Sequence, residues 1–145
     1  MRMSIRPMEE KDKACIMELM RVFYSSPAVL TNGSEMIFDA DFRACVSDSP
    51  YLEGFVFENG GDVLGYAMVA KSFSTEFGKP CIWIEDLYVK EAHRGCGIGT
   101  SFLHFIEGKY PECVFRLEAE AENEMAIHVY EKHGFQVLPY LEMKK

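Results

Sequence analysis

The segment HRGCGIGT, residues 93–100, places three glycines in five positions between a stretch with strand periodicity and one with helix periodicity. Glycine adopts backbone conformations that are closed to other residues, so the main chain can turn tightly or approach a ligand closely. The first N–H groups of a helix lack intrahelical partners, and together with the helix dipole they favour an anion. The segment therefore predicts a strand–turn–helix unit whose turn binds a phosphate. The alternative is a tight turn that needs its glycines only for steric reasons.

Two common phosphate-binding patterns do not fit this turn. A dinucleotide fingerprint requires glycine at its first, third and sixth positions. The sixth position is Thr100 when counted from Gly95, and Phe102 when counted from Gly97. A Walker P-loop ends in Gly-Lys-Ser or Gly-Lys-Thr, and the sequence contains neither tripeptide. The turn thus belongs to another kind of loop.

The spacing of apolar residues predicts the order of the remaining elements. The helical pattern, with Ser34 as the N-cap of the second helix, predicts helices over 12–23, 34–46, 98–109 and 123–133. Alternation predicts strands over 3–6, 54–58, 63–73, 81–89 and 114–119, and a last extended stretch over 135–143. Strands grouped in the middle and helical crossovers at the end indicate an α/β (α+β) fold with a mixed sheet flanked by helices.

Length and charge narrow the possible functions. With 145 residues and 48% hydrophobic composition, we expect one domain spanning residues 1–145. The net charge of −8 disfavours a nucleic-acid partner, because such proteins present a basic face. The same charge would attract a cationic small substrate, or it serves solubility alone. No stretch is long and apolar enough for a signal or membrane segment, so we expect no membrane partner.

The cysteines and histidines predict neither disulfides nor a metal site. The five cysteines are widely spaced and form no CxxC pair, which is typical of free thiols in a cytoplasmic protein. The four histidines show no spacing typical of metal ligands.

Two motifs carry a resemblance to the GNAT acetyltransferase superfamily. Arg94, Gly97 and Gly99 have the spacing R-x-x-G-x-G, which resembles the superfamily's pyrophosphate loop. Residues 123–135, NEMAIHVYEKHGF, resemble its second signature, N-x-x-A-x-x-x-Y-x-K-x-G-F. The resemblance covers nearly the whole chain and is most specific over 81–135. It implies a mostly antiparallel central sheet of six to seven strands flanked by about four helices.

The resemblance also implies a cosubstrate and roles for particular residues. Acetyl-coenzyme A would give its acetyl group directly to an amine, without an acyl-enzyme. Backbone groups of Leu87, Tyr88 and Val89 would bind the pantetheine arm, together with Asn123. Tyr130 would be the general acid at the sulfur, and Ala126, four residues earlier on the same helix face, would leave room for the ligand. The pyrophosphate would lie on Arg94, Gly95, Cys96, Gly97, Ile98, Gly99 and Thr100.

The segment CIWIEDLYV, residues 81–89, offers a general base. An aliphatic amine is mostly protonated at neutral pH, so the site must help to remove a proton before the nitrogen attacks. Glu85 lies in an apolar strand beside Trp83 and Leu87, where partial desolvation raises a carboxyl pKa. Strict alternation would place it on the face opposite Asp86, unless a bulge resets the pattern. Asp86 is the alternative base, either could act through water, and a solvent-facing Glu85 without a role is the plainer alternative.

The acceptor amine is less well defined by the sequence. Residues 73–89, including the pairs Trp83-Ile84 and Glu85-Asp86, resemble the diamine branch of the superfamily, which contains spermidine/spermine acetyltransferases. We therefore expect Trp83, Glu85 and Asp86 to bind a diamine or polyamine. Glu122 stands where that branch commonly has tryptophan, so peptide, protein, aminoglycoside and amino-acid amines stay open. We expect the loop 24–29 to set selectivity, and resemblance alone suggests a homodimer. The rival class is a non-catalytic module that senses acyl-coenzyme A.

Overall fold

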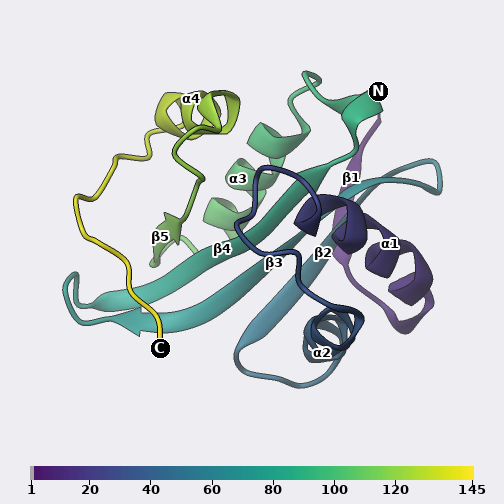
Figure 1. Cartoon of the computed structure of the whole chain (residues 1–145), viewed down its shortest axis with the longest axis horizontal. Coiled ribbons are helices and arrows are strands. Elements are labelled where there is room, and N and C mark those ends of the chain that lie inside the picture. The colour runs from purple at the N-terminus through teal and green to yellow at the C-terminus, as the bar shows by residue number, and fades with distance from the viewer. Residues whose placement is uncertain (1) are drawn as a thin grey trace.

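The computed structural model describes residues 2–145. Within them a five-stranded sheet has the order β1-β2-β3-β4-β5 (Figure 1). The strands are β1 (Ser4–Pro7), β2 (Leu52–Asn59), β3 (Asp62–Ser74), β4 (Lys79–Val89) and β5 (Val114–Leu117). The α-helices are α1 (Lys13–Tyr24), α2 (Glu35–Val46), α3 (Ile98–Lys109) and α4 (Glu124–Lys132). None of the helices in the described part of the chain has the length and apolar character needed to cross a membrane.

Helices cover both faces of the sheet (Figure 1). The first three strand pairs are antiparallel, and β4 and β5 are parallel. One face packs against α1 and α2 through a cluster that includes Met20 and Phe42, and the other packs against α3 through a cluster that includes Phe57 and Phe102. Burial of these large side chains supplies most of the stabilisation. The predicted class, a mixed and mostly antiparallel sheet between about four helices, is confirmed.

The predicted number of strands, six to seven, is too high for residues 2–145. The last extended stretch, 135–143, forms no ladder with the outer edge of β5. Side-chain contacts hold it instead. Phe135 packs against the cluster beneath α3, and the Tyr140 hydroxyl donates to Glu76 Oε2 at 2.6 Å. The stretch is therefore held by the contacts of Phe135 and Tyr140 and not by backbone pairing with β5.

A β-bulge at Glu85 changes the side-chain alternation along β4. The register with β3 skips Glu85, which pairs with no residue of that strand. Strict alternation would place Ile82, Ile84, Asp86 and Tyr88 on one face. Instead, Ile82 and Ile84 pack beneath α3, whereas Asp86 and Tyr88 lie on the side of α1. The extra residue thus resets the pattern in the middle of the strand, as bulges do.

Local sequence signals set the helix ends near the site. Ser34 and Asn123 are the N-caps of α2 and α4, and the Asn123 Oδ1 atom accepts the N–H of Ala126 at 3.4 Å. Helix α3 begins directly after Gly97, whose φ of 79° lies in the left-handed region. Helix α4 ends before Gly134, with φ 101°. Capping and glycine chemistry therefore position both elements that carry the two motifs.

Candidate active site

Strands β4 and β5 separate at the bulge. Their pairing ends at Ile84 and Leu117, so beyond that point β4 has β3 as its only partner strand among residues 2–145. A cavity of about 90 Å³ lies at this separation. Five residues expected in the site come together in its walls: Glu85, Leu87, Asn123, Ala126 and Tyr130.

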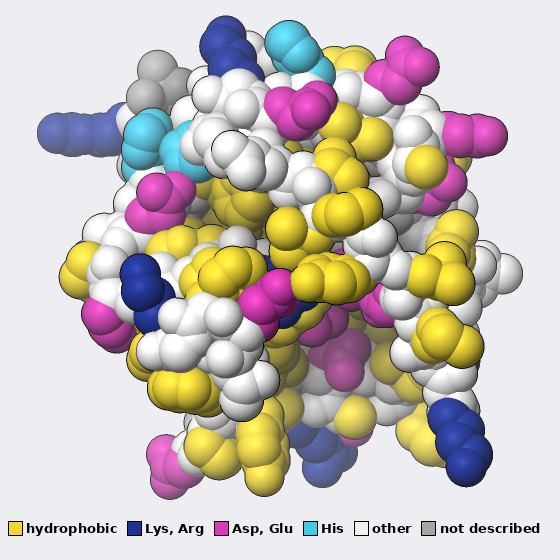
Figure 2. Space-filling model, turned by 90° about the vertical axis from the view of Figure 1, so that its left-hand side faces the viewer, with side chains coloured by type: hydrophobic (Ala, Val, Ile, Leu, Met, Phe, Trp, Pro, Cys, Tyr) yellow, Lys and Arg dark blue, Asp and Glu magenta, His cyan; other side chains and the backbone are white. Residues whose placement is uncertain are grey.

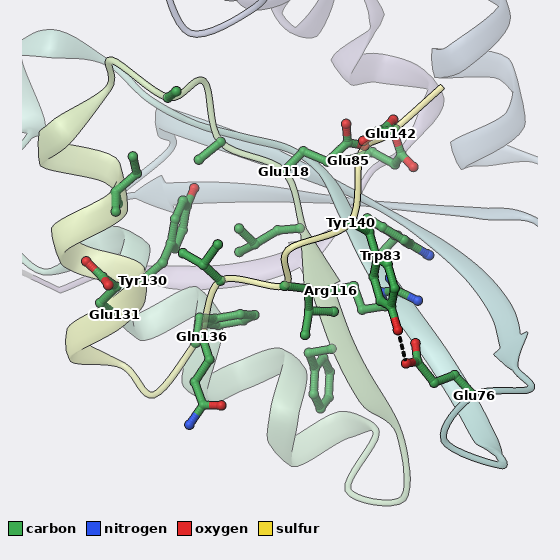
Figure 3. Close-up of a pocket in the computed structure, with 18 residues that line it drawn as sticks. Glu76, Trp83, Glu85, Arg116, Glu118, Tyr130, Glu131, Gln136, Tyr140 and Glu142 are labelled. Carbon is green, nitrogen blue, oxygen red and sulfur yellow. Dashed lines mark hydrogen bonds between the residues drawn. The ribbon is translucent and has the colours of Figure 1, made fainter. Parts of the chain in front are cut away.

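A larger cavity, of about 860 Å³, lies between β4, β5, α4 and the C-terminal stretch (Figure 3). Glu85 and Tyr130 line both cavities, from β4 and α4 respectively. Figure 2 looks onto this side of the molecule, where hydrophobic side chains and carboxylates surround a hollow. The charged lining consists of one guanidinium, from Arg116, and of the carboxylates of Glu76, Glu85, Glu118, Glu131 and Glu142.

Three of these carboxylates, from Glu85, Glu118 and Glu142, lie together at one side of the larger cavity (Figure 3). Partial burial, with the charges of Asp86 and Glu142, raises the pKa of the solvent-accessible Glu85 above its ordinary value. A hydrogen bond with Glu142 and partial burial raise the pKa of Glu118 to about 7. Glu85 is therefore a stronger base than an ordinary glutamate, as its neighbours in the sequence suggest.

Tyr130 enters the site from the half-buried face of α4. Burial raises the pKa of its phenol above the ordinary value, so the hydroxyl keeps its proton at neutral pH. Ala126 lies one turn earlier on the same face and lines the smaller cavity with it. Asn123 lines that cavity too, while its side-chain oxygen caps the helix. The arrangement can supply a proton to a group held between the strands.

Asp86 is not brought together with Glu85 and Tyr130, because the bulge turns it towards α1. It lines neither cavity and is 2% exposed. Its two oxygens accept the hydroxyl protons of Tyr24 at 2.8 Å and Tyr66 at 2.7 Å. Burial raises the Asp86 pKa, and these hydrogen bonds oppose the shift. Because Tyr24 belongs to α1 and Tyr66 to β3, the Asp86 carboxylate links α1 to the sheet through these two hydrogen bonds.

The glycine-rich turn presents unpaired backbone donors. Gly95 and Gly97 have φ of 80° and 79°, in the region that favours glycine. Across residues 2–145 no acceptor is bonded to the N–H groups of Gly95, Cys96 or Gly97. The amides of Ile98, Gly99 and Thr100 open α3 and have no partner one turn earlier. These donors and the helix dipole are suited to a pyrophosphate.

Arg94 fixes this turn to the end of β4. Its Nε atom donates to the carbonyl of Val89 at 2.9 Å, and its guanidinium lies 5.5 Å from the centroid of the Tyr88 ring. Tyr88 is buried on the side of α1, whereas Leu87 and Val89 pack on the side of α3. The arginine of the first motif thus joins the turn to the strand expected to hold the pantetheine arm.

Sequence reasoning missed the outer wall of the larger cavity. Trp83 lines it as expected, but the Arg116 guanidinium lies over the indole, 4.7 Å from its centroid. Tyr140 and Glu142 come from the C-terminal stretch and carry no motif. No signal in the sequence places that stretch against β5, because its position depends on tertiary contacts alone. The loop expected to set selectivity contributes Ala28 to the smaller cavity.

Metal-ligating side chains are not clustered in the described residues. Between residues 2 and 145, no group of three or more His, Cys, Asp or Glu side chains could hold a metal ion. All five cysteines are free thiols, and Cys96 is exposed on the glycine-rich turn.

A match to a known protein family includes the residues of both motifs. Residues 16–135 match the Acetyltransferase (GNAT) family. The chain therefore belongs to the GNAT family, and it is an acetyl-CoA-dependent acetyltransferase. Among curated proteins, none matches the sequence significantly.

Solved structures share the fold at low sequence identity. A possible acetyltransferase from Clostridium difficile 630 is 20% identical, with a TM-score of 0.83 over 99% of this chain and 96% of that one. AAC(6')-Iy, in complex with the bisubstrate analog CoA-S-monomethyl-acetylneamine, is 17% identical, with a TM-score of 0.79 over 100% and 98% of the two chains. A predicted acetyltransferase from Clostridium acetobutylicum, with acetyl-CoA, is 19% identical, with a TM-score of 0.77 over 99% and 96%.

Proposed function

We propose that the protein transfers an acetyl group from acetyl-CoA to a primary amine of a small cationic molecule, with diamines and polyamines as the favoured class. The observation that carries this proposal is the lining of the larger cavity. Glu85 and Tyr130 both belong to it, and it contains five carboxylates but one guanidinium. Such a lining attracts a molecule with several ammonium groups and repels an anionic one. The net charge of −8 acts in the same direction at longer range.

In this proposal each side chain has one chemical task. Acetyl-CoA supplies the acetyl group as a thioester. Glu85, directly or through a water molecule, accepts the proton that the acceptor ammonium must lose before its nitrogen can bond to the thioester carbon. Tyr130 donates its phenolic proton to the sulfur as the carbon–sulfur bond breaks. The nitrogen releases its second proton as the amide forms, and this proton passes through water to the Tyr130 phenolate, while Glu85 returns its proton to solvent.

The coenzyme is held by backbone groups rather than by side chains. The N–H groups of residues 95–100 bind its pyrophosphate, and Arg94 keeps that turn in place on β4. The pantetheine arm enters the separation between β4 and β5, where backbone groups of 87–89 and Asn123 bind it. One N–H of β4 polarises the thioester carbonyl. This path leads from the turn to the smaller cavity that Tyr130 lines.

The proposal is tested by free-thiol release from acetyl-CoA against a panel of amines. The panel contains polyamines, diamines, lysine analogues, aminoglycosides, peptides and a neutral monoamine, and calorimetry measures coenzyme binding separately. We expect polyamines and diamines to give the highest kcat/KM and the neutral monoamine the lowest. Turnover confined to peptides would refute the proposed acceptor class.

A second candidate acceptor is an aminoglycoside, which is also a multiply charged amine. The cavity favours it through its size and its aromatic walls, formed by Trp83 and Tyr140. AAC(6')-Iy, which shares the fold, is seen with an acetylneamine analog. A higher kcat/KM for aminoglycosides than for polyamines would favour this candidate. Coenzyme binding without turnover on any amine would favour the sensing module instead.

We further propose that the protein forms a homodimer through its C-terminal stretch. Val137, Leu141 and Met143 are each more than three-quarters exposed at 77%, 86% and 84%, and the outer edge of β5 has no partner strand within residues 2–145. An unpaired edge beside exposed apolar residues favours association. Light scattering after size exclusion should give twice the monomer mass, and Leu141→Lys should give the monomer. A wild-type monomer would refute the proposal.

A further inference from the structure

We propose that His133 and Phe135 are positioning residues for Tyr130, and that the contact of His133 with Glu107 on α3 is what fixes them. The inference rests on the proposed role of Tyr130 as the general acid. Helix α4 carries that acid, yet none of its residues is fully buried. Its C-terminal end must therefore be held by specific contacts rather than by a buried apolar face.

The first contact is made by the backbone at the end of α4. The N–H of Gly134 bonds to the carbonyl of Glu131 at 3.0 Å, and the N–H of Phe135 bonds to the carbonyl of Tyr130 at 3.0 Å. This pair of bonds around a glycine with φ 101° is the Schellman closure of a helix. It returns the chain towards Tyr130, and the Phe135 ring packs edge-on against the Tyr130 ring with 5.9 Å between centroids.

The second contact links this helix end to α3. His133 is 9% exposed at its side chain, and its Nε2 atom lies 2.5 Å from Glu107 Oε1. Its ring lies 6.4 Å from the Phe135 ring and 4.6 Å from the ring of His104, centroid to centroid. Contacts thus run without a gap from α3 through His133 and Phe135 to Tyr130. Helix α3 is itself anchored by the buried residues Ile98, Phe102, Leu103 and Ile106.

This series of contacts ends at Tyr130 and does not include the glycine-rich turn. A proton donor must lie within hydrogen-bond reach of the atom it serves, and misplacement by about 1 Å can cost up to ~10²-fold in rate. The glycine-rich turn, which binds the pyrophosphate in the proposed function, directly precedes the first residue of α3, whereas Glu107 lies in the last turn of that helix. Loss of the His133 contact should therefore lower kcat and leave coenzyme affinity unchanged.

The test compares His133→Ala with His133→Gln and His128→Ala. Glutamine can place its Nε2 where the histidine Nε2 lies and so keeps a donor for Glu107. His128 is exposed on the same helix and provides the matched control. We expect His133→Ala to lower kcat about 10-fold, with the dissociation constant of acetyl-CoA unchanged. His133→Gln should recover most of that loss, and His128→Ala should equal wild type.

A second measurement does not depend on turnover. The Tyr130 ring resonance, assigned by Tyr130→Phe in tyrosine-labelled protein, should shift and broaden in His133→Ala but not in His128→Ala. An unmoved resonance would overturn the positioning role, as would a kcat equal to that of the control. A lower melting temperature with unchanged kcat at saturation would also overturn it. If wild type turns over no amine, the proposed function fails, and the resonance still decides whether His133 positions Tyr130.

Discussion

In the proposed function, the Tyr130 hydroxyl is the general acid of acetyl transfer and is not needed for coenzyme binding. Its ring is largely buried and its phenol is protonated at neutral pH. We expect Tyr130→Phe to lower kcat by about 10²-fold, the range typical of a general acid, because only the donated proton is lost. Calorimetry should give the same acetyl-CoA affinity as wild type. An unchanged kcat would remove Tyr130 from the chemistry.

Glu85 should set the acidic limb of the pH profile. Its pKa is raised, and only the ionised form can accept a proton, so kcat at saturating acceptor should rise with pH through a pKa above the ordinary glutamate value. Glu85→Gln should lower kcat by about 10²-fold and remove this limb. Glu131→Gln, which changes a carboxylate of α4 in the lining of the same cavity, is the control. A limb that persists in Glu85→Gln would show that another group is the base.

At the scale of elements, the first turn of α3 allows a test in which the substitution does not strain the fold. A Cβ added to Gly99 or to Gly108, both in α3, would meet no protein atom within 4 Å. Gly99→Ala and Gly108→Ala should therefore each stabilise the protein by up to about 1 kcal/mol. Only Gly99→Ala should weaken coenzyme binding, because only Gly99 belongs to the segment that is proposed to bind the pyrophosphate. Equal coenzyme affinities in the two variants would contradict the phosphate-loop assignment.

The elements near the two motifs could be predicted closely from the sequence, because their signals are local. The predicted helix over 98–109 coincides with α3, and Ser34 and Asn123 cap the helices that they were expected to cap. The sequence shows that a bulge in β4 is possible but does not locate it. The bulge is a shift in the pairing between β4 and β3, and the sequence of one strand does not define how it pairs with another. This shift explains why Asp86 lies against Tyr24 and Tyr66 rather than in the larger cavity. The path of residues 135–143 depends on tertiary contacts, so it could not be predicted from a local sequence pattern either.

At the scale of the whole molecule, the paired carboxylates of Glu118 and Glu142 should couple acceptor binding to pH. The pKa of Glu118 is about 7 in the free protein, so this carboxyl loses its proton as the pH rises through neutrality. A cation binds better to the ionised pair, so the KM for a polyamine should fall as pH rises through that value. Glu118→Gln should flatten the dependence, while its coenzyme affinity stays constant. A pH-independent wild-type KM would contradict the coupling.

The whole chain, with its GNAT fold, glycine-rich turn and acidic cavity, is proposed to acetylate a polycationic amine. The most direct measurement is the kcat/KM for acetyl transfer to a polyamine and to a neutral monoamine of the same length, at low and high salt. We expect a strong preference for the polyamine that decreases as salt rises, because ionic strength screens the attraction of the acidic lining. Equal kcat/KM for the two amines, or a preference unaffected by salt, would contradict the cationic acceptor.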